Sequence, residues 1–428
     1  MNESSLAQTS SHREESGLAV RVFRPVLLSR LQDVQGGCIH IRDGSESLIL
    51  GRADAPSTLR AEVVVHDPRF YSTTLLGGNL GAAESYIQGH WACEDLPALF
   101  RILARNMDLV DRMDQGFAGV VSWAAGLWRF LKRNSRSGSR KNIHAHYDLG
   151  NEFFALFLDP TMTYSAALFQ RPEMTLEEAQ KAKLDRICRK LDLKPKDHLL
   201  EIGTGWGSLA IHAAGNFGCR VTTTTISKEQ YQVARQRVEA AGLSDRVEVL
   251  LKDYRDLEGA YDKLVSIEMI EAVGYEYFDT YFRKCSELLK SDGLMLLQAI
   301  TIPDHRLQRH RRSVDFIQHY IFPGSFIPTT ASICESLARV TDLRLIHLED
   351  ITQHYATTLK HWRERFMEKL ESVRNLGYPE TFTRMWEYYL AYCEAGFAER
   401  YNGDVQMLLA KPRCFRPPLL PELPSEGG

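Results

Sequence analysis

Residues 198–207 read HLLEIGTGWG, an apolar run that ends in an acid, followed by a turn that contains three glycines. The pattern predicts a strand over 198–202, a tight turn over 203–207 and a helix over 208–214. This order brings backbone close to a ligand at the carboxyl end of a sheet, and glycine adopts such turns without a steric penalty. The motif alone is common, and dinucleotide binding is the rival interpretation. However, Ser208 stands where the dinucleotide fingerprint requires its third glycine.

Further strands are expected downstream, over 219–224, 247–251 and 261–267. Each is followed by polar residues, among them Thr225, Asp253 and Glu271. Because the carboxyl ends of parallel strands meet at one edge of a sheet, these residues predict a single ligand crevice. One polar strand end could be a helix cap or a turn, but four together favour a site. Helical and strand patterns alternate from 144 to about 412, which predicts a doubly wound α/β domain.

The remaining sequence predicts a modular chain. Residues 1–18 are polar and predict a disordered tail. Residues 19–114 predict a small N-terminal α/β domain, residues 115–143 an amphipathic and basic linker, and residues 144–413 the main domain. Residues 414–428 predict a Pro-rich tail.

Composition restricts the class of protein. A net charge of −3 gives no indication of nucleic-acid binding. The eight cysteines are scattered without a C-x-x-C pair, which argues against a zinc site or any other metal site and against a disulfide framework. We therefore expect reduced thiols and a cytoplasmic location. The N-terminus lacks a signal-peptide pattern, and no apolar run reaches the ~18 residues of a membrane span, so any membrane contact is expected to be peripheral.

Further motifs place the sequence close to one family. They are HYDLGN at 146–151, YS at 164–165, TISKEQ at 225–230, DYRD at 253–256, EAVG at 271–274 and YIFPG at 320–324. With these motifs in this order, residues 75–412 closely resemble the cyclopropane fatty-acid synthase family of methyltransferases that use S-adenosylmethionine (SAM). The resemblance implies a Rossmann-like class I methyltransferase domain and a homodimer.

The resemblance also implies a cofactor site. The residues that would bind SAM are Tyr164, Ser165, Glu201, Gly203, Thr204, Gly205, Trp206, Gly207, Thr225, Gln230, Asp253 and Tyr254.

The implied substrate is a cis double bond in a phospholipid acyl chain. An alkene is a poor nucleophile, so the sulfonium methyl must be held in near-attack geometry. Methyl transfer leaves a carbocation, which needs a dry pocket, and a base must then take a proton. Proton loss from the new methyl closes a cyclopropane. Alternatively, the same cation gives a methylene branch, which a partner reductase could saturate.

In the family the implied base is a bound bicarbonate. The matching residues are Glu271, Tyr355 and the backbone near Ile300. Glu271 is the strongest catalytic candidate, because a carboxylate in an apolar context is costly without a partner or a task. A helix cap or an ion pair is the alternative. We expect Glu271→Gln to retain cofactor binding and to lose ~10²-fold in turnover.

Two positions depart from the family pattern at the anion site. Ala166 stands where the family pattern has cysteine, and Gln298 where it has histidine. Glutamine can still donate a hydrogen bond, whereas an alanine side chain cannot. The base is therefore either bicarbonate held differently or Glu271 acting through water. Cys393 matches a cysteine assigned to the active site in the family, although the chemistry needs no thiolate, and a structural role is the alternative.

A segment before the main domain is expected to meet the membrane. The apolar stretch with Trp123 and Trp128 precedes six basic residues, Arg129, Lys132, Arg133, Arg136, Arg140 and Lys141. Such a combination suits the anionic inner face of a membrane, and a solvated linker is the alternative. Two other functions remain open: a methyltransferase for soluble acceptors and a non-catalytic lipid-binding protein.

Overall fold

The computed structural model describes residues 19–52, 58–115, 134, 138, 149–417 and 419. The chain forms two compact units, which are considered separately. Unit 1 comprises Met1–Leu131, His310–Ile321 and Leu359–Tyr401, and unit 2 comprises Lys132–Arg309, Phe322–Thr358 and Asn402–Gly428. Predictions for residues 1–18, for the tryptophan-containing stretch with its basic neighbours, for residues 146–148 and for residues 420–428 lie outside the described residues.

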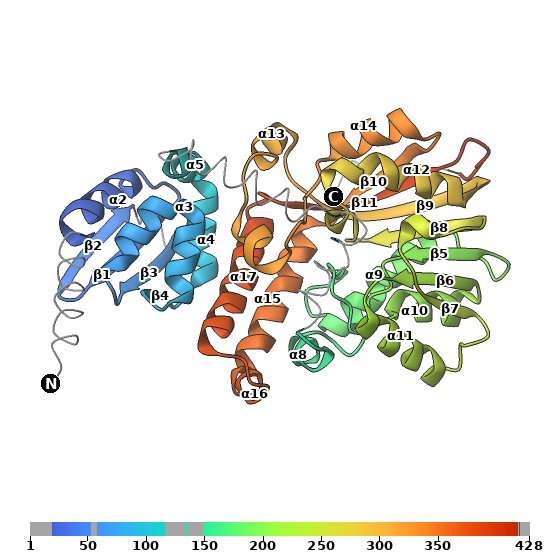
Figure 1. Cartoon of the computed structure of the whole chain (residues 1–428), viewed down its shortest axis with the longest axis horizontal. Helices are drawn as coiled ribbons and strands as arrows, with labels where there is room; N and C mark the ends of the chain where they lie inside the picture. Colours follow the sequence, from blue (N-terminus) through green and yellow to red (C-terminus); the bar gives the residue numbers. More distant parts are fainter. Residues whose placement is uncertain are drawn as a thin grey trace, which may run out of the picture. The chain divides into compact units, whose positions relative to one another are not determined.

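Unit 2 is built on a seven-stranded sheet of order β10-β11-β9-β8-β5-β6-β7 (Figure 1). The strands are β5 His198–Ile202, β6 Arg220–Thr225, β7 Val247–Leu251, β8 Tyr261–Ile267, β9 Leu289–Thr301, β10 Arg344–Asp350 and β11 Gly403–Ala410. All pairings from β9 to β7 are parallel, and β11 runs antiparallel to both of its neighbours. The chain order reverses at β5, which is where such sheets bind ligands.

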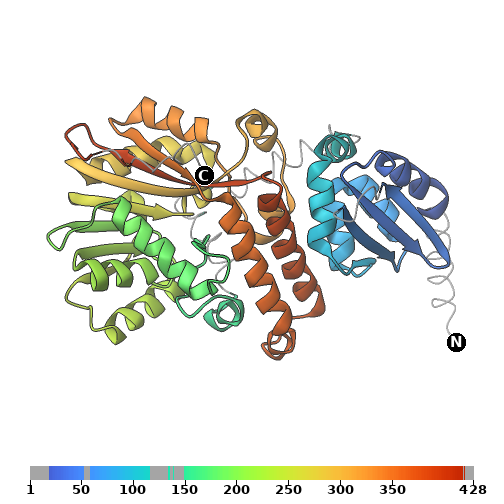
Figure 2. The same ribbon diagram turned by 180° about the vertical axis from the view of Figure 1, so that it is seen from behind.

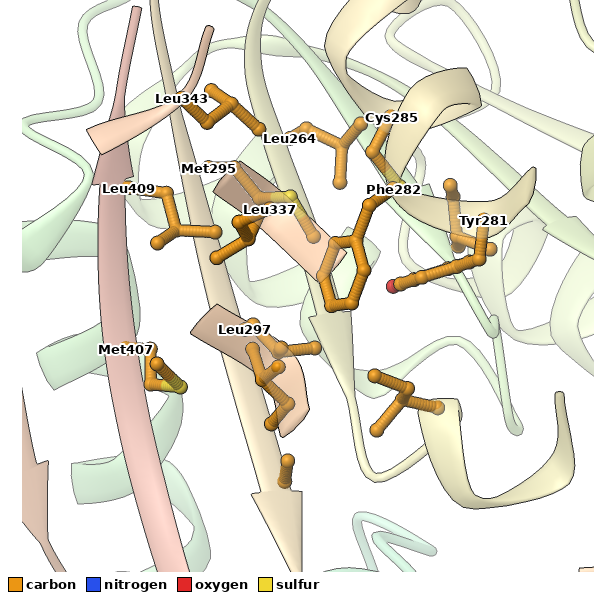
Figure 3. Packing of buried hydrophobic residues seen from close by; sticks show 14 of the residues in the cluster. Leu264, Tyr281, Phe282, Cys285, Met295, Leu297, Leu337, Leu343, Met407 and Leu409 are labelled. Atoms are coloured by element: carbon orange, nitrogen blue, oxygen red, sulfur yellow. The ribbon is translucent and has the colours of Figure 1, made fainter. Parts of the chain in front are cut away.

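Helices cover both faces of this sheet because its strands are apolar on both sides. On one face α9 Leu176–Lys190, α10 Ser208–Phe217 and α11 Lys228–Ala240 pack on a core that includes Leu199 and Leu296. Figure 2 shows the green helix α9 across this face. On the other face α12 Phe278–Leu288 and α14 Thr330–Val340 pack on a core that includes Leu200, Met295 and Leu297. Figure 3 shows Met295 and Leu297 in this core. Neighbouring strand residues thus point to opposite cores, which confirms the doubly wound α/β prediction.

The strand and helix starts follow the sequence signals. The strands expected at 198–202, 247–251 and 261–267 are confirmed, and the one expected at 219–224 lies one residue later. Helix α9 begins with a capping box in which Thr175 and Glu178 exchange hydrogen bonds. Helix α11 begins where the Ser227 side chain accepts a bond from the backbone N–H of Gln230.

Unit 1 contains a four-stranded sheet of order β2-β1-β3-β4. Its strands are β1 Gly37–Asp43, β2 Glu46–Gly51, β3 Leu59–Val65 and β4 Trp91–Cys93, and its helices include α2 Arg24–Leu31, α3 Arg69–Ile87, α4 Leu96–Arg105, α5 Met107–Gln115, α16 Leu370–Asn375 and α17 Glu380–Ala398. These strands and helices give residues 19–114 the mixed α/β character that the sequence predicts.

Helix α17 belongs to unit 1, which differs from the contiguous domains expected from the sequence. The Tyr86 hydroxyl of α3 donates to Glu387 of α17 over 2.9 Å. The rings of Phe100 and Tyr388 lie 4.7 Å apart. Two arginines of α4 also pair with Glu399. The aromatic face of α17 is therefore buried against helices nearly 300 residues away.

Among the helices of the described ranges, none is long and apolar enough to cross a membrane.

Candidate active site

The glycine turn of unit 2 leaves open space beside its backbone. Gly203, Gly205 and Gly207 have φ values of 104°, 52° and 86°, which L side chains rarely adopt. The N–H groups of Gly203 and Thr204 both donate to the Thr224 carbonyl, each over 3.1 Å. A Cβ added at Gly205 would meet no protein atom within 4 Å. The turn is thus fixed to β6 while one side stays accessible to a ligand.

The side chain of Glu201 stabilises this turn through hydrogen bonds. Its Oε2 accepts a 2.6 Å hydrogen bond from the Thr223 hydroxyl, which lies 2.7 Å from the Thr204 hydroxyl. Burial raises the pKa of Glu201 to about 8, although Thr223 and the cation of Lys183 oppose that rise. In this structure, Glu201 fastens the turn to the neighbouring strand, and its contact with a cofactor stays a prediction.

Trp206 is an anchor as well. The indole is buried, and its Nε1 donates to Asn151 Oδ1 over 2.6 Å. Its ring lies 5.2 Å from that of Phe154, so it attaches the short helix α8 Asn151–Phe157 to the turn. The Trp206 carbonyl accepts from Arg237 over 2.9 Å.

The polar strand ends also have internal partners. Thr225 donates through its hydroxyl to Gln230 Oε1 over 2.8 Å, so the structure brings these two predicted cofactor residues together. The Asp253 carboxylate accepts two bonds from the Arg255 guanidinium, at 2.8 and 2.7 Å. Burial raises the pKa of the Tyr254 hydroxyl, which is therefore neutral.

The Tyr164–Ser165 pair connects this region to a buried lysine. The Tyr164 ring packs 5.3 Å from Phe154. Ser165 Oγ accepts a 2.7 Å hydrogen bond from Lys183 Nζ. Burial lowers the pKa of Lys183 to about 8, against the opposing effect of nearby acids, of which Glu268 is the strongest.

Glu268 is the centre of a buried polar cluster that the sequence reasoning did not single out. It directly follows β8 and has a φ of 46°. Its Oε1 accepts bonds from the Ala166 N–H over 2.8 Å and from Gln298 Nε2 over 2.7 Å. Its Oε2 accepts from the Tyr355 hydroxyl over 2.8 Å. The signal available in the sequence was its position at a strand end, comparable to Thr225.

The cluster continues into β11. Gln298 Nε2 also donates to Asp404 Oδ2 over 3.1 Å, and Gln298 Oε1 accepts from Gln406 over 3.0 Å. Asp404 is fully buried. Burial, followed by the charges of Glu268 and Glu271, raises its pKa well above the usual value.

Glu271 completes the cluster. Its Oε1 accepts a 2.6 Å hydrogen bond from the Ile300 N–H. Its Oε2 is buried without a hydrogen-bond partner among the residues described. Burial, and then the charge of Glu268, raise the pKa of Glu271 to about 8. The predicted residues Glu271, Gln298 and Tyr355 are thus brought together around Glu268.

Cys393 belongs to the other unit. It is on α17 in unit 1, whereas the Glu268 cluster is in unit 2. Burial, and then the charge of Asp315, raise the pKa of this thiol, so it is neutral and a poor nucleophile. All eight cysteines are free. No group of His, Cys, Asp or Glu suited to a metal ion occurs in the described part of the chain.

The glycine turn and the carboxylate cluster are adjacent. A Cβ at Gly203 would lie 3.2 Å from Met269 Cγ, and Met269 follows Glu268 in the chain. An accessible glycine turn beside a buried carboxylate can hold a cofactor next to a base.

Comparisons with known proteins show which proteins this chain resembles. The family model for mycolic acid cyclopropane synthetase matches residues 134–407. Tuberculostearic acid methyltransferase UfaA1 of Mycobacterium tuberculosis is 44% identical over 342 residues, covering 78% of this chain and 79% of that protein. Cyclopropane-fatty-acyl-phospholipid synthase of Escherichia coli is 37% identical over 348 residues, covering 81% and 86%.

Solved structures agree. The cyclopropane synthase MmaA2 from Mycobacterium tuberculosis and the mycolic acid cyclopropane synthase CmaA1 complexed with SAH and CTAB each superpose with a TM-score of 0.60 and 33% identity. Each match covers 64% of this chain and 98% of the other. These findings confirm the class I methyltransferase fold and the SAM cofactor. The chain belongs to the mycolic acid cyclopropane synthetase family and is a SAM-dependent methyltransferase.

Proposed function

We propose that the chain transfers the methyl group of SAM to the cis double bond of an unsaturated phospholipid acyl chain and closes a cyclopropane. The observation that carries this proposal is the half-buried carboxylate of Glu268, held by three donors beside the glycine turn. A carbocation needs a nearby negative charge and a base inside a dry site. The similarity to cyclopropane-fatty-acyl-phospholipid synthase supports a phospholipid substrate.

The reaction has two bond-forming steps. The alkene electron pair attacks the sulfonium methyl, so one alkene carbon gains the methyl and the other becomes cationic. A C–H bond of the new methyl then breaks, and its electron pair closes the ring onto the cationic carbon. The proton goes to a base, and SAM leaves as S-adenosylhomocysteine.

A methylene-branched chain is the second candidate product. If a hydride first moves from the methylated carbon to the cation, proton loss from the same methyl gives a methylene (=CH2) branch on the chain. The greater identity to a tuberculostearic acid methyltransferase favours this route, as do Ala166 and Gln298 in place of the family's cysteine and histidine. Both routes use one base at one position, so they share the site.

NMR of the lipid product decides between the two. The purified protein is incubated with SAM and vesicles of unsaturated, partly anionic phospholipid, and we expect cyclopropane ring protons. The two products have the same mass, so mass alone does not separate them. Signals of a =CH2 branch would replace the first candidate by the second, and methylation of a soluble acceptor without vesicles would contradict both.

We further propose that the protein acts in the cytoplasm as a homodimer on the inner face of the membrane. Trp123, Trp128 and the basic residues that follow them suit an anionic surface, at ~1 kcal/mol for each basic residue near it. The same vesicle assay should therefore lose rate at high salt and with neutral vesicles. A rate that is independent of both would contradict docking through this segment.

A further inference from the structure

The groups that would hold a bicarbonate already have partners within the chain. The Tyr355 hydroxyl, the side chain at position 298 and the backbone N–H at 166 all donate to Glu268. The Ile300 N–H donates to Glu271. A carboxylate of the protein thus lies where three donors converge, and the bicarbonate implied by the family does not fit without displacing it.

The local charge also disfavours an added anion. Glu268, Glu271 and Asp404 lie close together: the charge of Glu268 raises the pKa of both Glu271 and Asp404, and the charge of Glu271 raises the pKa of Asp404. Lys183 is the buried cation that interacts with Glu268 and Asp404. A further anion among three acids would add a desolvation cost and a repulsion with little to offset them.

We propose that Glu268 replaces bicarbonate as the base, so that this enzyme works without an external anion. The proposal rests on the proposed function. The C–H bond of the transferred methyl breaks, its electron pair forms the new carbon–carbon bond, and the proton binds to a Glu268 carboxylate oxygen. Glu268 becomes a neutral acid and later releases the proton to solvent.

Glu268 is better suited to this task than Glu271. Burial raises the pKa of Glu268 as well, but its three donors and the cation of Lys183 oppose that rise and favour the ionised form. Its Oε2 accepts only one described bond, which leaves a lone pair for a proton. Glu271 receives one backbone N–H, and its pKa of about 8 keeps it protonated at neutral pH. A protonated acid cannot accept the methyl proton.

The test begins with the unaltered protein in buffer freed of carbon dioxide. We expect the lipid methylation rate to be the same with and without added bicarbonate. A rate that collapses on removal of bicarbonate and returns with it would overturn the proposal.

Two substitutions of Glu268 extend the test: one removes the base, and the other makes room for bicarbonate. Glu268→Gln should lower turnover by ~10²-fold or more, the scale of general-base loss, while calorimetry shows unchanged binding of S-adenosylhomocysteine. Glu268→Gly empties the position, and glycine suits its φ of 46°. The turnover of this variant should be low without bicarbonate and should rise at least about tenfold when bicarbonate is added. Glu258→Gln, an exposed glutamate at the loop before β8, is the matched control.

A binding measurement keeps the inference separate from the proposed function. Carbon-13 NMR of labelled bicarbonate should show binding to Glu268→Gly and none to the unaltered protein. If no variant methylates lipid but this difference in binding appears, the proposed substrate is wrong and the occupied anion position stands. Bicarbonate binding to the unaltered protein, or full turnover by Glu268→Gln, would remove Glu268 as the base.

Discussion

At the residue scale, the buried acid Glu201 makes stability depend on pH. Burial raises its pKa to about 8 from the usual value of 4.5. A raised pKa means that the acid favours the folded state when protonated. This contribution is complete below pH 4.5 and is lost as the pH rises through about 8.

We therefore expect Glu201→Gln, which cannot ionise, to lose less stability than the unaltered protein over that window. The difference in the free energy of unfolding should change by at most about 1.4 kcal/mol per pH unit. Urea denaturation of the cofactor-free protein at several pH values measures it. Parallel curves for the two proteins would show that Glu201 is already ionised in the fold.

The same scale explains why the sequence revealed Glu271 but not Glu268. The motif at 271–274 resembles the family's, and this placed Glu271 in the site. Glu268 acquires its role from Ala166, Gln298 and Tyr355, which lie far from it in the chain. No local pattern encodes that convergence, since each donor is ordinary in its own context.

At the element scale, the strand–turn–helix unit from β5 to α10 was predictable because its signals are local. Apolar runs set the strands, and glycines mark the turn that follows β5. The internal hydrogen bonds of Thr225, Asp253 and Trp206 were not predictable, because they depend on which element each strand end faces.

The turn offers a prediction with a close control. In Gly205→Ala the new Cβ enters the open side of the turn, so we expect at least about tenfold weaker S-adenosylhomocysteine binding, together with ~1–2 kcal/mol of backbone strain. Gly242→Ala, at φ 68° and also without neighbours within 4 Å, should show the strain alone. Calorimetry and urea denaturation separate the two effects. Equal affinities for both variants would mean that the cofactor does not approach Gly205.

At the scale of the whole molecule, the sequence predicted the elements better than the grouping of them. Contiguous boundaries assign α17 to the main domain, whereas the structure groups Leu359–Tyr401 with the N-terminal unit. Alternation of helix and strand patterns shows where elements occur. Which helix covers which aromatic surface depends on contacts between remote segments, such as Tyr86 with Glu387.

The integrity of unit 1 should depend on one arginine of α17. Arg384 donates to the carbonyls of Tyr86 over 2.6 Å and of Trp91 over 2.7 Å, and its guanidinium lies 4.1 Å from the centroid of the Tyr86 ring. Arg384→Met keeps the aliphatic stem but removes the side-chain donor of the Trp91 carbonyl and one of the two donors of the Tyr86 carbonyl, which keeps the Gly89 N–H. We expect a cost of about 1–3 kcal/mol. Hydrogen exchange should accelerate in β4 and at the end of α3, while S-adenosylhomocysteine affinity stays unchanged because the glycine turn lies in unit 2.

Arg374→Met is the control for that substitution. Arg374 pairs with Glu380 over 3.0 Å, but both side chains are more than half exposed, at 51% and 61%. Exposed pairs contribute less than ~1 kcal/mol, so exchange in unit 1 should not change. If Arg384→Met instead left β4 protected, or weakened cofactor binding as strongly as it loosened unit 1, α17 would not be a structural member of that unit alone. Its assignment as one compact body with the N-terminal sheet would then need revision.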